Sequence, residues 1–214
     1  MKSVILIFLL CFSAFLANAQ SVIGGSFAVD YNLLSIVKSE FSPDSIKSVA
    51  QNYNPIRNGG ISVGIPLNIR LHRFALFRPQ AVFNFMLNQV DFGTGSTAAT
   101  SIRIQNINVE FPLQMMFTDL NKNKGIAGIF GIRGGHRIQE VQPDNTKFLN
   151  MKTNYAFLDV GMGYRVRIAK KTMIMPELRC SLGLNSILES GGTPYNLAIE
   201  RMKQNRISLV LNFM

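Results

Sequence analysis

The sequence contains little of what cytoplasmic enzymes use for chemistry: no tryptophan, two cysteines and two histidines. Cys11 lies in an N-terminal apolar run, so Cys180 has no partner for a disulfide and there is no cysteine-based metal cluster. No His-Glu-x-x-His, Gly-x-Ser-x-Gly or glycine-rich phosphate loop occurs. His136, with Glu140 nearby, is the sole arrangement that resembles a base with an acid, and it matches no motif. The sequence therefore predicts a protein without catalytic residues, metal or cofactor.

Charge is also scarce. Lys, Arg, Asp and Glu make up 16% of the chain, against about 25% in an average soluble domain. Beyond the N-terminal segment, however, no uncharged apolar run approaches the ~20 residues of a membrane-spanning helix. An apolar chain without such runs is typical of a transmembrane β-barrel, in which lipid-facing and interior side chains alternate along each strand.

The first residues resemble an export signal. Lys2 supplies the positive charge, an apolar run extends from Val4 to Leu16, and Ala17-Asn18-Ala19 has the small-x-small pattern of a cleavage site. We expect a signal peptide over residues 1–19 and one mature domain over residues 20–214. The formal net charge of +10 would suit a partner such as nucleic acid, but the export signal argues against that partner. Outer-membrane lipid, lipopolysaccharide phosphates or an acidic protein are the more natural partners.

Strict alternation of apolar and polar residues recurs along the chain. Between Gly60 and His72, every second residue from Ile61 to Leu71 is apolar, which is enough to cover the ~25 Å lipid-facing band of an outer-membrane barrel. The pattern predicts eight strands, the smallest even number seen in such barrels. They are Val22–Tyr31, Gly60–His72, Phe77–Asn88, Asn106–Phe117, Ile126–Gln139, Leu158–Ile168, Met173–Leu184 and Ile207–Phe213.

Two observations favour a membrane barrel over a soluble, lipocalin-like barrel with its apolar face inside. The polar face is built from Gly, Asn, Gln, Ser and mixed charges, whereas a solvated face is usually rich in Lys and Glu. The predicted connections also alternate between long and short, as periplasmic turns and extracellular loops do. The first long connection, residues 32–58, has two interpretations: a surface loop, or a lid with a short helix from Ser42 to Val49.

Aromatic girdles normally mark the two membrane interfaces of a barrel. Without tryptophan, this role falls to tyrosine and phenylalanine, and we expect Tyr31, Tyr155 and Tyr164 to contribute to it.

The polar face places many charges inside the predicted barrel. Eight strands leave an interior just wide enough for side chains to fill, and buried charges must be paired or hydrogen-bonded. We interpret these residues as a structural ion network that fills the barrel. The sharper alternative is a narrow anion path lined by the excess arginines. The residues are Arg70, Arg78, Glu110, Arg133, Asp159, Arg165, Arg167, Glu177 and Arg179, with Arg137 on the same face.

Several segments resemble the PorT family. The most specific are Met175-Pro176-Glu177-Leu178-Arg179, Ser181-Leu182-Gly183-Leu184-Asn185 and, before the last strand, Ile199-Glu200-Arg201. Earlier similarities are Leu76-Phe77-Arg78-Pro79, Val109-Glu110-Phe111-Pro112-Leu113 and the stretch from Gly131 to Gly135.

The resemblance implies an outer-membrane β-barrel of the Bacteroidota that takes part in type IX protein secretion and gliding motility. It implies no enzymatic activity and no cofactor, and it points to other type IX secretion subunits as partners. Three further interpretations are a generic small barrel that anchors the envelope or binds a ligand at its outer face, a narrow porin, and a soluble lipocalin-like binder.

Overall fold

The computed structural model describes residues 21–38, 58–92, 100–142, 149–169, 172–189 and 199–214. The expected signal peptide, residues 1–19, lies outside the described residues. Every regular secondary-structure element among the described residues is a β-strand, as the alternating pattern predicts. The strands are β1 (Ser21–Ile23), β2 (Gly25–Lys38), β3 (Gly59–His72), β4 (Ala75–Phe92), β5 (Thr100–Phe117), β6 (Lys124–Val141), β7 (Asn154–Ala169), β8 (Thr172–Gly183) and β9 (Ile199–Phe213).

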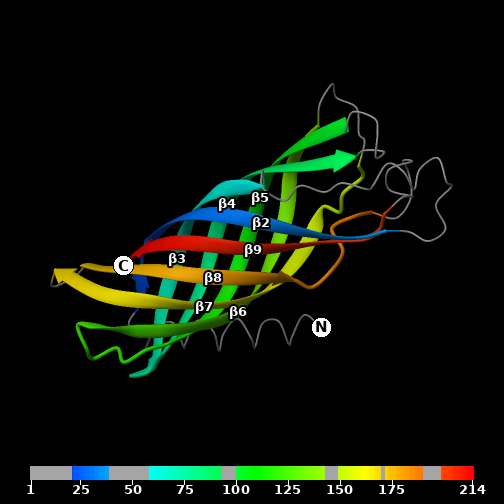
Figure 1. Cartoon of the computed structure of the whole chain (residues 1–214). Helices are drawn as coiled ribbons and strands as arrows, with labels where there is room; N and C mark the ends of the chain where they lie inside the picture. Colours follow the sequence, from blue (N-terminus) through cyan, green and yellow to red (C-terminus); the bar gives the residue numbers. More distant parts are fainter. Residues whose placement is uncertain (1–20, 39–57, 93–99, 143–148, 170–171, 190–198) are drawn as a thin grey trace, which may run out of the picture.

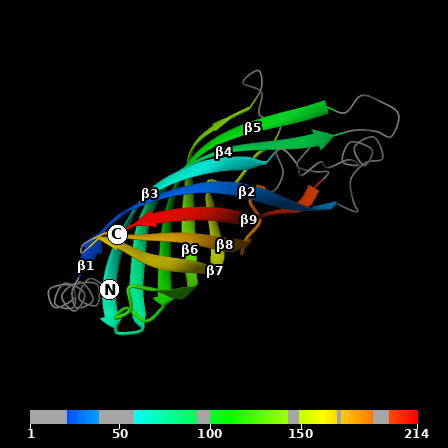
Figure 2. The ribbon, with the colours of Figure 1, turned by 60° about the vertical axis from the view of Figure 1, so that its left-hand side comes forward.

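The strands form one closed antiparallel barrel (Figures 1 and 2). Each strand from β3 to β9 pairs with its neighbours in the sequence, and β9 returns to pair with β2. Closure leaves no exposed sheet edge, which is the only way a sheet can satisfy all its backbone groups without water.

Strands β1 and β2 form a single barrel strand with one interruption. Ser21 pairs with Ile69 and Ser26 with Gly64, which is one continuous register along β3. At the break, the Gly24 N–H donates to the Pro66 carbonyl over 2.9 Å, while Pro66 has no N–H to return. A Cβ at Gly24 would lie 2.1 Å from the Phe213 carbonyl oxygen, so only glycine fits there. The predicted eight-stranded barrel is therefore confirmed.

The connections differ in length at the two ends of the barrel, as predicted. Residues 39–58, 93–99, 142–153 and 184–198 join strands at one end, and each connection is longer than those at the other. We call these the long-loop end and the short-turn end. The short-turn end carries residues 73–74, 118–123 and 170–171, and the C-terminus lies there (Figure 1).

The largest corrections to the predicted strand limits lie at the end of β2 and at the start of β9. Leu33 to Val37 belong to β2 and not to the first long connection, because strands β2 and β9 extend together beyond the predicted membrane band. For the same reason β9 begins at Ile199, whereas alternation predicted its start at Ile207. The short helix expected at Ser42–Val49 lies outside the described residues.

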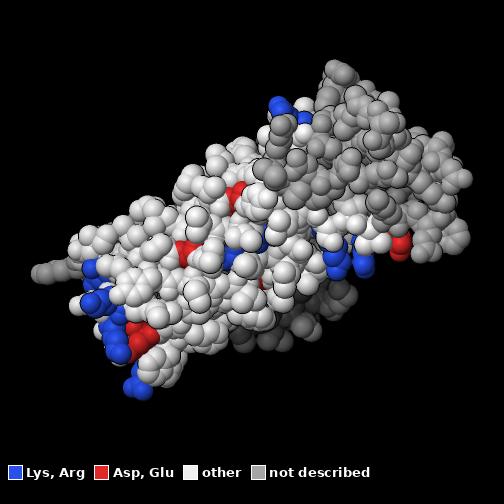
Figure 3. Space-filling view, viewed as in Figure 1, with Lys and Arg blue, Asp and Glu red and all other residues white. Residues whose placement is uncertain are grey.

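The outer wall is apolar along most of its height. Ile126, Leu209 and Met162 expose 74%, 65% and 62% of their surface, which a water-soluble monomer rarely allows over a continuous area. In Figure 3 the Lys and Arg atoms gather mainly toward the two ends, and the wall between them is mostly white. Among the described outward-facing strand residues, charged side chains lie near strand ends: Lys124 at the short-turn end, and Arg103, Arg201 and Lys203 at the long-loop end.

Among the described residues, no helix is long and apolar enough to cross a membrane.

Both ends of the interior are filled with apolar side chains. At the long-loop end, a cluster that includes Leu34, Leu149, Ile187 and Met202 joins the strands to the connections β6–β7 and β8–β9. At the short-turn end, Met116, Met175 and the C-terminal Met214 belong to a second cluster. Met214 also exchanges backbone hydrogen bonds with Met173. The polar part of the interior therefore lies between two apolar caps.

Candidate functional site: a charge network inside the barrel

Strand β6 provides the space in which the network assembles. Its inward face reads Gly131, Arg133, Gly135, so a long cationic side chain has a glycine on either side. A Cβ at Gly131 would lie 2.8 Å from the Gln114 Cα, and a Cβ at Gly135 would lie 2.1 Å from the Tyr155 ring. Small and large residues alternate inside narrow barrels so that their side chains fit. The two glycines let side chains of β5 and β7 meet across β6.

Glu110 on β5 is the centre with the most partners. Arg206 donates from both terminal nitrogens to the two carboxylate oxygens, over 2.9 and 2.8 Å. Arg133 donates to Oε2 over 2.9 Å, and the Tyr155 hydroxyl donates to Oε1 over 2.8 Å across Gly135. Glu110, Arg206 and Arg133 are all almost completely buried. Such paired, charge-assisted bonds are the strongest hydrogen bonds available to a side chain.

Arg133 connects Glu110 to a second carboxylate. Its Nη2 donates to Asp159 Oδ2 over 2.9 Å and its Nε over 3.1 Å. Gln114 donates to the same oxygen over 2.8 Å, reaching across Gly131. The side-chain oxygen of Gln114, Oε1, in turn accepts a hydrogen bond from Arg78 Nη2 over 2.8 Å. The network therefore continues without a break from β9 through β5, β6 and β7 to β4.

Glu177 on β8 completes the network. Arg78 donates to its two oxygens, over 2.5 and 3.0 Å. Arg179 donates to Oε2 over 2.7 Å, and the Asn212 amide donates to Oε1 over 2.7 Å. Arg78 and Glu177 lie 99 residues apart in the sequence, so this pair ties together opposite parts of the barrel.

Asp30 on β2 is held by neutral donors. The hydroxyls of Ser62 and Ser208 and the amide of Asn84 all donate to its carboxylate. Asn108 extends this group by donating to Asn84 over 3.2 Å. A carboxylate with three such bonds is satisfied without an arginine in direct contact.

The central network is electrically balanced. Four arginines and four carboxylates are buried together, and a cavity beside Asp30 has a volume of only about 10 Å³. That is about one water probe sphere. A balanced and filled interior favours a structural network over an anion path lined by unpaired arginines. The buried groups are Arg78, Arg133, Arg179, Arg206, Asp30, Glu110, Asp159 and Glu177.

Three predicted members lie outside the network. Arg165 is buried, but it donates to the backbone carbonyls of Asp119, Leu120 and Lys122 and so holds the short β5–β6 turn. Arg70 and Arg167 lie near the same end of the barrel, where they donate to the side chains of Asn121 and Asn123. They were predicted inside because they share the inward phase. Their strands, however, end there, so the side chains reach the turn and solvent.

Arg137 also lies apart from the network, at the long-loop end. It pairs with Glu140 over 3.0 Å, which accounts for the acid that the sequence placed near His136. The His136 ring is exposed, and its Nδ1 is hydrogen-bonded to Asn154 Oδ1 over 2.8 Å. The two residues of the hypothetical base–acid pair therefore use other partners.

Sequence reasoning missed three members of the interior. Arg206 was assigned to a loop because the predicted last strand began at Ile207, eight residues after the observed start of β9 at Ile199. Asp30 lies on the inward phase of a predicted strand, and the alternation of apolar and polar residues along that strand would have identified it as an interior residue. Tyr155 was expected in an outer girdle, but its ring lies inside the barrel and its hydroxyl bonds Glu110. Tyr31 and Tyr164 do face outward, as expected.

No protein-family model matches the chain. No curated protein sequence matches it either. Among solved structures, the outer membrane protein OprG from Pseudomonas aeruginosa is similar with a TM-score of 0.50 and 14% identity, over 90% of this chain and 93% of OprG. The attachment invasion locus protein Ail of Yersinia pestis matches with a TM-score of 0.38 and 10% identity, over 89% of this chain and 96% of Ail. The likeness to OprG shows that the fold is that of an eight-stranded outer-membrane β-barrel.

Proposed function

We propose that this protein spans the outer membrane as a closed, non-conducting and non-catalytic barrel, and that it serves type IX protein secretion as an assembly factor or accessory subunit. A signal peptide at residues 1–19 directs its export. Its partners are outer-membrane lipid, lipopolysaccharide and other subunits of the secretion apparatus. Nucleic acid and cofactors have no part in this role.

The observation that carries the proposal is the contrast between the two faces of the barrel wall. The outer face has an apolar band with charge near its ends, which suits a hydrocarbon layer about 25 Å thick. The inner face is filled by a balanced ion network between two apolar caps. A barrel with a filled interior acts through its rims and connections, which is how a subunit of a larger apparatus makes contacts.

The secretion role rests on the resemblance to the PorT family. Much of that resemblance coincides with residues of the network. Glu177 and Arg179 lie in the Met175–Arg179 segment, and Glu110 and Arg133 lie in two of the earlier segments. The similar residues thus include those that hold the barrel together. The contacts with other subunits are therefore assigned to the connections at the two ends of the barrel.

A second candidate function is a generic envelope anchor, which the same closed barrel supports equally well. The two proposals differ in their effect on protein export, since an anchor carries no cargo. A narrow porin is a weaker candidate, because the cavity beside Asp30 is only about 10 Å³ and the network leaves no continuous row of unpaired cations.

The test is deletion of the gene in its host, followed by comparison of the medium and the periplasm for proteins that carry the type IX C-terminal signal. We expect cargo to accumulate in the periplasm and the intact gene to restore secretion. Normal secretion in the deletion strain would reject the secretion role and leave the anchor.

A matched variant separates loss of the barrel from loss of a contact. The double variant Lys203→Ser, Arg201→Ser changes only outward side chains at the long-loop end of β9. The barrel should still assemble and remain in the outer membrane.

Conductance of the purified wild-type protein in planar bilayers is expected to be absent, and stable single channels would instead favour the porin.

A further inference from the structure

A groove crosses the outer wall of the barrel near the long-loop end. It has a volume of about 510 Å³, within the range of ligand-binding pockets. Its lining comes from three adjacent strands, and the outward side chains among it are mostly apolar: Ile61 on β3, Phe85 and Leu87 on β4, and Ile107 on β5. The groove is therefore an indentation in the membrane-facing wall and not part of the interior.

Glycine creates this indentation. Gly59 faces outward in the cross-strand row Tyr31, Gly59, Leu87, Gln105, so one position in the row has no side chain. Beside it, a Cβ at Gly60 would lie 2.4 Å from the Phe85 carbonyl oxygen, so glycine at this position permits the close approach of β3 and β4. The floor of the groove is thus backbone, and its sides are Ile61, Leu87 and their neighbours.

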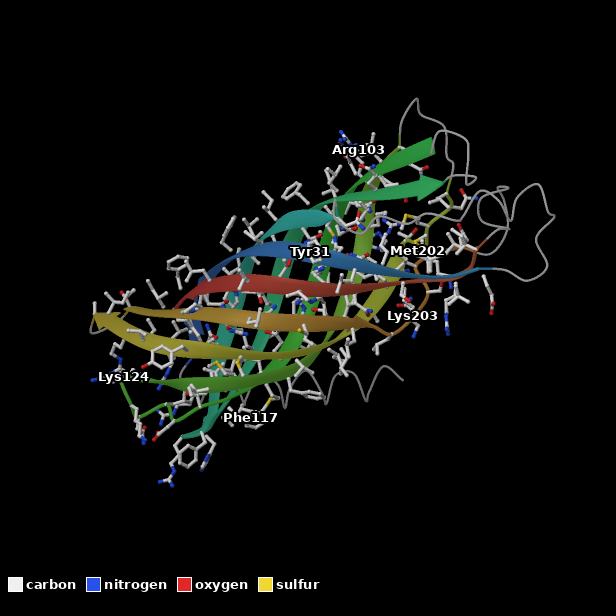
Figure 4. All side chains as sticks on the ribbon, in the orientation of Figure 1. Tyr31, Arg103, Phe117, Lys124, Met202 and Lys203 are labelled. Carbon is white, nitrogen blue, oxygen red and sulfur yellow. The ribbon has the colours of Figure 1, made fainter. Side chains whose placement is uncertain are left out.

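On β5, a cation occupies the next outward-facing position beyond the groove lining, toward the long-loop end, and we call this position the mouth of the groove. Arg103 is exposed on β5, on the same outward face as Gln105 and Ile107, which line the groove. Figure 4 shows Arg103 toward the long-loop end, with Phe117 of the same strand at the opposite end. In the described part of the chain, no carboxylate forms an ion pair with Arg103. From the mouth inward, the surface therefore changes from cationic to polar to apolar.

We propose that this groove binds an acyl chain of phosphorylated lipid A, the membrane anchor of lipopolysaccharide, and that Arg103 binds its phosphate. The order of chemistry along β5 matches such a lipid in the outer leaflet, with the anionic headgroup at the long-loop end and the chain directed toward the membrane centre. A guanidinium suits a phosphate because it can donate two parallel bonds. This inference rests on the proposed location in the outer membrane, but not on the role in secretion.

The structure offers a pair of substitutions that fill the groove or spare it. Gly59 has only the Asp30 carbonyl oxygen near its missing Cβ, at 3.4 Å, so Gly59→Phe can place a ring in the groove without a backbone clash. The control is Gly134→Phe on β6. Gly134 also faces outward, has nothing within 4 Å of its missing Cβ, and lies outside the groove. Both variants add the same apolar ring to the membrane-facing wall.

The experiment measures lipid binding to the purified, detergent-folded protein by native mass spectrometry. The probes are phosphorylated lipid A, its dephosphorylated form and phosphatidylglycerol. We expect Gly59→Phe, which fills the groove, and Arg103→Glu, which removes a charge-assisted contact, each to weaken binding of phosphorylated lipid A by about ten-fold. Gly134→Phe and Lys203→Glu should stay within about two-fold of wild type. Folding of every variant is checked by its heat-dependent mobility in gels.

Removing the phosphates should abolish the effect of Arg103→Glu but keep that of Gly59→Phe, because only the first residue binds the headgroup. Equal binding of phosphatidylglycerol and lipid A would overturn the assignment to lipid A. Unchanged binding in a folded Gly59→Phe variant would overturn the groove itself. A failure of the secretion proposal would appear only in the deletion strain, and so the two results are distinguishable.

Discussion

The inner and outer faces of the same strands follow opposite rules for charge. On β9, Arg206, Ser208 and Asn212 face inward and each donates to a carboxylate, whereas Ile207 and Leu209 face outward and remain apolar. Adjacent residues thus experience two environments a few ångströms apart. Inside, a charge is tolerated because a partner is in place. On the outer face, no partner can compensate a charge within the apolar band, so charged side chains lie near the ends of the strands.

The largest expected effect comes from removing one carboxylate of the inner face. Glu110→Ala leaves Arg133, Arg206 and the Tyr155 hydroxyl without their shared acceptor. Breaking a buried ion pair from one side costs about 3–5 kcal/mol. We expect a loss of that size in the free energy of unfolding, measured by urea unfolding in lipid vesicles. Tyr155→Phe removes one bond only and should cost about 1 kcal/mol. Equal losses in the two variants would contradict a network centred on Glu110.

A charge placed on the outer face should have the next largest effect. Leu209 exposes 65% of its surface and pairs with Val29 and Leu178, both outward-facing and apolar. Leu209→Arg is expected to cost about 2–4 kcal/mol in the free energy of unfolding in vesicles. Leu209→Ile serves as the control and should change little. If the arginine variant were as stable as wild type, this face would not lie against hydrocarbon.

The smallest effect is expected where the inward phase leaves the barrel. Arg70→Ala and Arg167→Ala each remove a hydrogen bond to an exposed asparagine of the short β5–β6 turn. Substitutions at such solvent-exposed positions usually change stability by no more than about 0.5 kcal/mol. The same unfolding assay checks this result. A loss of several kcal/mol would restore these residues to the inner network in which the sequence placed them.

Alternation predicted the barrel because it records which face of a strand meets lipid. It failed where strands extend beyond the lipid. In β2, Leu34 faces inward into the apolar cap while Leu33 faces outward, so the segment is apolar on both faces and resembles a helix or a loop. In β9, Met202 faces inward and Arg201 and Lys203 face outward, which inverts the pattern expected in the membrane.

The membership of the network was predictable, but its pairing was not. A charge on the inward phase of a narrow barrel must lie inside, and Arg78, Glu110 and Glu177 were found in this way. Which arginine bonds which carboxylate depends on the register between strands and on the tilt of the barrel. Two residues 99 apart, such as Arg78 and Glu177, carry no local signal of their contact.

The position of β9 in the sequence has a consequence for how the barrel assembles. Three of the four central carboxylates receive a donor from this last strand: Glu110 from Arg206, Asp30 from Ser208 and Glu177 from Asn212. The Asp30 contact spans 178 residues, and pairing between distant segments is slow. A partly built barrel that lacks β9 would hold these acids with too few donors. Pairing of β9 with β2 therefore closes the barrel and supplies the missing donors to the interior carboxylates in one step, which disfavours stable half-assembled barrels.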